Sequence, residues 1–60
     1  MSKEEIIYAM EIRGYYYDGI DSYDEWVCFN YELGRISFSS WEDVSEWLDG
    51  VVWEELASND

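Results

Sequence analysis

The sequence predicts an α+β fold: a three-stranded antiparallel sheet in β-β-β-α order, with a C-terminal amphipathic helix packed on one face. Three segments, at residues 5–13, 25–33 and 35–39, alternate apolar and polar side chains with the period of two that is typical of half-buried strands. The last segment, residues 39–57, repeats its apolar residues with the helical period instead. A chain of 60 residues is sufficient for one small core, so residues 1–60 are expected to form a single acidic domain.

Residues 5–13 are predicted to form the first strand. One parity of the segment is apolar throughout and consists of Ile6, Tyr8, Met10 and Ile12. A helix is the alternative, because Ser2 and Glu5 have the spacing of a capping box. The period of two over the whole segment favours the strand.

Two glycines in the residues that follow are predicted to change the direction of the chain. Gly14 is predicted to form a bulge or bend, after which Tyr15–Tyr17 continue the strand in a new direction. Residues 18–24 are predicted to be a loop, in which Gly19 is a turn residue.

Residues 25–33 and 35–39 are predicted to form a hairpin with a tight turn through Gly34. Cys28 lies in the first of these strands and, as the lone cysteine of the chain, has no disulfide partner within it. We expect a small buried side chain there and a reducing, cytosolic compartment. The apolar faces of the two strands consist of Val27, Phe29, Tyr31 and Leu33, and of Ile36 and Phe38.

Residues 39–57 are predicted to form the helix. Ser40 can cap it, and Glu42 and Asp43 lie in the first turn, where the helix dipole favours negative charge. Because a glycine costs roughly 1 kcal/mol inside a helix, a break at Gly50 with a short angled continuation is the alternative. At about 100° per residue, one broad face is apolar and consists of Trp41, Val44, Trp47, Leu48, Val51 and Val52.

The opposite side of this helix has an acidic row, defined here as Glu42, Glu46, Asp49 and Trp53. Like charges one helical turn apart destabilise a helix by a few tenths of a kcal/mol per pair. An ordinary solvated face interleaves Lys or Arg, yet no base follows Arg35 in this sequence. The acidic row is therefore a candidate partner-binding surface, with a plain solvated face as the alternative.

The stretch GYYYDGIDSYDEW, residues 14–26, combines carboxylates with aromatic rings and contains no base or histidine. Tyr and Trp bury large areas at low entropic cost and are enriched at binding hot spots. Asp18, Asp21 and Asp24 are spaced by three, which does not fit an EF-hand loop, so no metal site is predicted. The candidate partner-binding residues of this stretch are Tyr16, Asp18, Asp21, Tyr23, Asp24 and Glu25.

The net charge of −12 limits the possible partners. The sequence has fifteen acids, and its only bases are Lys3, Arg13 and Arg35, so the protein would be repelled by nucleic acid and by acidic membrane surfaces. The partner that such a charge attracts is a basic protein surface. We expect a monomer or a small homo-oligomer that contacts neither nucleic acid nor membrane directly.

Catalysis is not predicted. The chain has no histidine, which is the commonest general base, and Cys28 therefore lacks the partner that would activate it as a nucleophile. The glycines do not form a phosphate-binding loop. We predict no catalytic residue and no cofactor.

Carboxylates on successive helical turns are about 5–6 Å apart, close to the spacing of about 6–7 Å between phosphates along a DNA strand. In size, charge and aromatic content the chain resembles the small acidic nucleic-acid mimics made by phages, such as anti-restriction proteins, anti-CRISPR proteins and uracil-DNA glycosylase inhibitors. The resemblance implies an inhibitor that occupies the basic nucleic-acid-binding surface of a host defence protein, and it assigns no residue roles. The alternatives are an antitoxin or immunity protein that neutralises a basic nuclease toxin, and a structural domain whose acidity only ensures solubility.

Overall fold

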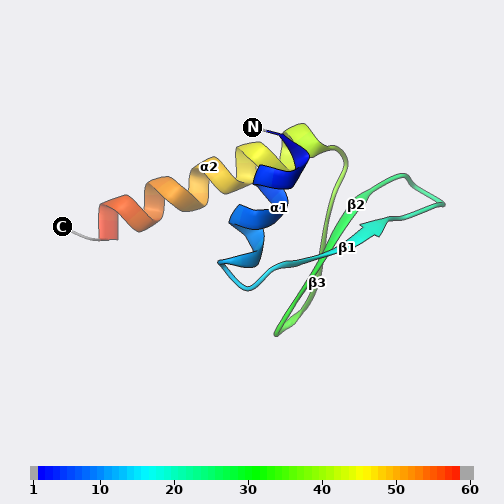
Figure 1. Cartoon of the computed structure of the whole chain (residues 1–60), viewed down its shortest axis with the longest axis horizontal. Coiled ribbons are helices and arrows are strands. Elements are labelled where there is room, and N and C mark those ends of the chain that lie inside the picture. The colour runs from blue at the N-terminus through cyan, green and yellow to red at the C-terminus, as the bar shows by residue number, and fades with distance from the viewer. Residues whose placement is uncertain (1, 59–60) are drawn as a thin grey trace.

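The computed structural model describes residues 2–58, which form two helices and three strands (Figure 1). The strands make one antiparallel sheet in the order β1-β2-β3, and the last helix packs on it, so the predicted α+β class and architecture are confirmed. In chain order the elements are α1 (Lys3–Glu11), β1 (Tyr16–Ile20), β2 (Val27–Tyr31), β3 (Gly34–Phe38) and α2 (Trp41–Ser58).

The prediction that residues 5–13 form a strand is wrong, because this segment lies in α1. The capping box decides the conformation: the Ser2 hydroxyl accepts a hydrogen bond from the Glu5 backbone N–H at 3.2 Å, and the Glu5 carboxylate accepts one from the Ser2 N–H at 3.4 Å. Ile6 and Met10, one helical turn apart, are buried. Their spacing of four fits both a strand and a helix, which explains the misleading alternation.

The first strand therefore begins later than predicted. Gly14 has a φ of +89° and lies in the turn that follows α1, so it separates a helix from a strand and does not bend a strand. The predicted loop at residues 18–24 is wrong in its first part, since β1 continues to Ile20. The register against β2 shifts between Tyr17 and Gly19, which makes a bulge there, and the turn comes at residues 22–24.

The predicted hairpin is confirmed, with a shorter first strand and a second strand that begins one residue earlier than predicted. β2 and β3 pair without interruption from Val27 opposite Phe38 to Tyr31 opposite Gly34. The turn consists of residues 32–33, so Gly34 is the first residue of β3 and not the turn residue that was predicted. Cys28 is buried, as expected, and its Sγ lies 3.5 Å from both the Trp26 carbonyl oxygen and the Ser37 hydroxyl.

The core lies between the sheet and the two helices, which both cover the same face (Figure 1). Its buried side chains come from every element except β1: Ile6, Met10, Val27, Phe29, Phe38, Val44 and Leu48. A chain of aromatic contacts extends this core. It links Tyr31 through Tyr15, Trp47, Phe38 and Phe29 to Trp41 and Tyr17, with neighbouring ring centroids 5.2–6.3 Å apart.

α2 is continuous through Gly50, so the alternative of a break there is wrong. Its second half projects beyond α1 and the sheet, which makes the molecule elongated, at 43 × 24 × 16 Å (Figure 1). Arg13, just after α1, holds this half by donating to both carboxylate oxygens of Glu55, at 2.8 and 3.0 Å. Neither helix of the described chain is both long enough and apolar enough to cross a membrane.

Candidate functional site

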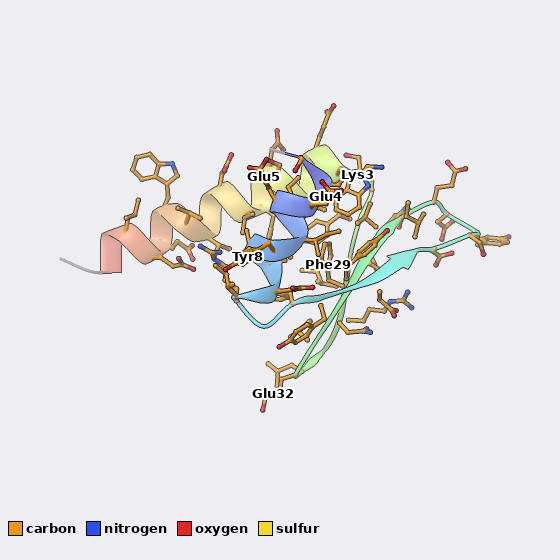
Figure 2. The ribbon with its side chains drawn as sticks, in the orientation of Figure 1. Lys3, Glu4, Glu5, Tyr8, Phe29 and Glu32 are labelled. Atoms are coloured by element: carbon orange, nitrogen blue, oxygen red, sulfur yellow. The ribbon has the colours of Figure 1, made fainter. Side chains whose placement is uncertain are left out.

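The acidic row lies on the solvent side of α2. Val44 and Leu48 are completely buried beneath the helix, whereas Glu42, Glu46 and Asp49 are exposed. Trp53 is 72% exposed, although Trp47 on the same helix packs against the core. The helical phase inferred from the sequence is therefore correct. In Figure 2, oxygen-tipped side chains and an indole stand along the side of α2 that faces away from the sheet.

Two serines position the first turn of α2. The Ser40 hydroxyl accepts a hydrogen bond from the Asp43 backbone N–H at 3.2 Å, which confirms the predicted cap. The Ser39 hydroxyl donates to the Asp43 carboxylate. Asp43 is thus used inside the fold, whereas Glu42 in the same turn has no side-chain partner among residues 2–58.

Asp21 has a structural role in the β1–β2 loop. Its carboxylate accepts hydrogen bonds from the backbone N–H groups of Tyr23 at 2.8 Å and Asp24 at 3.4 Å. Its carbonyl oxygen accepts from Glu25, which adopts a positive φ of 57°. The Asp21 carboxylate therefore caps the turn, and the carboxylates it leaves exposed at the loop tip belong to Asp24 and Glu25.

Asp18 and Tyr16 belong to the sheet and not to this loop. Asp18 lies in the β1 bulge and pairs with Arg35 of β3 at 3.2 Å. Tyr16 is 59% exposed on the same strand, and Tyr23 is 92% exposed at the loop tip. The other two tyrosines of the GYYYDG run, Tyr15 and Tyr17, pack in the aromatic chain described above.

All three basic side chains have partners inside the molecule. The Lys3 ammonium lies 5.6 Å from the ring centroid of Trp41, a cation–π contact. Arg13 pairs with Glu55, and Arg35 pairs with Asp18. No hydrogen bond or ion pair within residues 2–58 engages the side-chain carboxylates of Glu4, Glu11, Asp24, Glu25, Glu32, Glu42, Glu46, Asp49 and Glu54.

The outer side of α1 has a further exposed group that the sequence did not predict and that is separate from the acidic row. Glu4, Tyr8 and Glu11 are exposed and lie one turn apart along this helix, and the Tyr8 side chain is 60% exposed. Their grouping depends on the helical conformation, since a strand would place Tyr8 on the face opposite to Glu11. The capping box of Ser2 and Glu5 was the signal that could have revealed it.

The candidate residues are spread along the molecule. The β1–β2 loop lies at one end of the long axis and the C-terminal end of α2 lies at the other (Figure 1). Figure 2 places Glu4 and Glu5 on α1 beside the first half of α2, and Glu32 apart from them at the β2–β3 turn. The acidic row and the loop tip are thus two separate surfaces.

The described residues contain no detectable pocket, and no three His, Cys, Asp or Glu side chains among them are grouped as metal ligands would be. No protein-family model, curated protein or solved structure was found to match this chain.

Proposed function

We propose that this protein is an acidic nucleic-acid mimic of the phage type, which inhibits a host DNA- or RNA-binding defence protein by occupying its basic surface. The proposed function is that of the anti-CRISPR or anti-restriction class of inhibitors. The partner contributes Lys and Arg side chains that otherwise hold phosphates, and this chain contributes carboxylates in their place.

The observation that carries the proposal is the acidic row together with the internal use of every base. Glu42, Glu46 and Asp49 are exposed on one side of α2, and no cation of the described chain pairs with them. A helix gains stability when Lys is interleaved with such acids, and this helix has none. The uncompensated negative field therefore has a cost for folding, which a binding role would explain.

Exposed aromatic rings supply the uncharged part of the proposed interface. Trp53 continues the acidic row, Tyr16 lies at the start of β1, and Tyr23 lies in the β1–β2 loop at the opposite end of the molecule from the C-terminal end of α2. An indole or a phenol buries a large area with few rotatable bonds, so it anchors a complex that the charges steer. Trp53 is the anchor we assign to the row, because it shares its side of the helix.

The test uses two variants with equal charge. In the row variant, Glu42→Gln, Glu46→Gln and Asp49→Asn remove three negative charges from the acidic row. In the control variant, Glu11→Gln, Glu32→Gln and Glu54→Gln remove three exposed charges elsewhere. Each tagged protein is used to capture proteins from a lysate of a bacterial host, and double-stranded DNA or RNA is added as a competitor.

The wild type and the control variant are expected to retain a nucleic-acid-binding protein that the competitor displaces. The row variant is expected to retain it at least about tenfold less tightly, since close charge pairs at interfaces are worth more than 1 kcal/mol. Equal losses in both variants would show a bulk polyanion effect and contradict the proposal. Capture of a nuclease toxin that nucleic acid does not displace would support the antitoxin alternative instead.

A further inference from the structure

We propose that the outer edge of β3 is a self-association surface, at which a second copy of this chain adds its own β3 in the antiparallel direction. The resulting dimer would have one continuous sheet across both copies. This inference rests on the sheet and on the charge distribution, so it is independent of the proposed function.

β3 is an edge strand whose outward backbone groups have no partner in the described chain. Gly34–Phe38 pair only with β2, and no other backbone hydrogen bond within residues 2–58 reaches this strand. In an antiparallel pair, alternate residues direct their N–H and C=O groups away from the neighbouring strand. Such a row of unpaired groups is a template for a further strand.

The opposite edge of the sheet is protected. β1 has a bulge between Tyr17 and Gly19, and Asp18 lies within it. Bulges and charged side chains both discourage pairing at an edge. β3 has neither a bulge nor an acid, and its register against β2 is continuous over all five residues. Association through β3 therefore ends at the dimer, because the two outer edges that remain are both β1.

The distribution of acidic residues also favours association through the β3 edge. Residues 33–41 are the longest stretch of the sequence without an acid, and they include all of β3 and the basic residue Arg35. Two copies with a net charge of −12 each repel one another strongly. Pairing of β3 with a second β3 brings no carboxylate of one strand against a carboxylate of the other. Contacts through the acidic loop or through α2 would bring carboxylates of the two copies together.

The pairing register follows from the length of the strand. All five residues of β3 pair with a second β3 only when the two-fold axis passes through Ile36, the middle residue. Arg35 then lies opposite Ser37 of the second copy, on the sheet face that the helices leave uncovered. Leu33, which is 89% exposed, lies opposite Ser39 of the second copy and becomes partly covered.

The test is a pair of charge changes at Ser37. The dimer dissociation constant of each variant is measured by sedimentation over a concentration series up to about 1 mM. Salt at roughly 0.5 M screens the general repulsion between the acidic copies. Ser37→Lys places a cation opposite Arg35 of the second copy, and Ser37→Glu places an anion there. Because the contact occurs twice in a two-fold dimer, we expect Ser37→Lys to raise the dimer dissociation constant roughly three- to tenfold and Ser37→Glu to lower it by a similar factor.

The control changes are Ser22→Lys and Ser22→Glu, at an exposed serine in the β1–β2 loop. General repulsion between acidic molecules predicts the reverse order, in which an added Lys strengthens the dimer and an added Glu weakens it. The Ser22 variants are expected to follow that order weakly. A wild type that stays monomeric throughout the series, an assembly larger than a dimer, or Ser37 variants that follow the Ser22 order would overturn the proposal. Thermal melts of every variant verify that the fold is intact.

Discussion

Trp47 and Trp53 are the same kind of residue on the same helix, yet their surroundings are opposite. Trp47 packs against Tyr15 and Phe38, with ring centroids 5.2 and 5.7 Å away. Trp53 is 72% exposed and has no ring contact within the described residues. The helical period alone predicts this difference, because a period of 3.6 residues is sustained along the whole of α2.

Trp47→Ala is expected to destabilise the domain by about 3 kcal/mol, because it removes a large ring from the edge of a small core. Trp53→Ala is expected to change the stability by less than about 0.5 kcal/mol, as is usual for an exposed position. Chemical denaturation of both variants measures the two values. The assignment of Trp53 to the surface is contradicted if its removal unfolds the chain while that of Trp47 does not.

Individual carboxylates were harder to assign from the sequence than the tryptophans. Asp21 and Asp24 look equivalent in the sequence, but only Asp21 caps the turn. Asp18 forms an ion pair with Arg35 because β1 and β3 both flank β2, and that proximity arises only when the sheet forms. Local patterns thus predict which acids are present in a segment, whereas tertiary structure decides which of them the fold uses.

At the scale of elements, periodicity predicted the long helix and the hairpin and failed for the short segment at the N-terminus. In residues 5–13 Ile6 and Met10 satisfy both periods, whereas Tyr8 and Ile12 satisfy only the strand period and are exposed in the structure. The local hydrogen bonds of the Ser2 and Glu5 capping box outweigh strand propensity there. Once α1 is a helix, the sheet must take its first strand from β1, whose glycine and aspartate had indicated a loop.

Gly50 offers a direct test of the continuity of α2. It is exposed in the interior of the helix, and no atom lies within 4 Å of the position that an added Cβ would take. Gly50→Ala is therefore expected to stabilise the domain by about 1 kcal/mol, with a rise of several degrees in the melting midpoint.

The matched change is Gly14→Ala, which also meets open space but has a φ of +89° that alanine rarely adopts. This variant is expected to lower the melting midpoint. A fall in the midpoint for Gly50→Ala would mean that the helix is broken or strained at that residue.

The whole molecule is an elongated body whose negative charge extends over both helices and both hairpin turns. Most of this charge has no compensating cation, so mutual repulsion opposes the compact state. Composition alone predicted this feature, since net charge does not depend on the fold. How the acids divide between the row on α2, the loop tip and α1 required the structure.

Salt should therefore stabilise the isolated protein. Raising the ionic strength from about 0.01 M to about 0.1 M shortens the screening length from roughly 30 Å to 10 Å, which is below even the shortest dimension of the molecule, 16 Å. We expect the melting midpoint to rise over this range and to rise less in the row variant, which has lost three of the repelling charges. A midpoint that falls with salt would show that the internal ion pairs of Arg13 and Arg35 outweigh the repulsion.

The central claim, that the negative field of this protein imitates nucleic acid, is tested most directly by the rate at which it associates with the captured partner. Electrostatic steering predicts an association rate constant that falls steeply, by tenfold or more, as salt shortens the screening length from about 10 Å at 0.1 M to about 3 Å at 1 M. Stopped-flow mixing, with the fluorescence of Trp53 and the other indoles as the signal, measures this constant at each ionic strength. A rate constant that stays flat across the whole range would contradict the account.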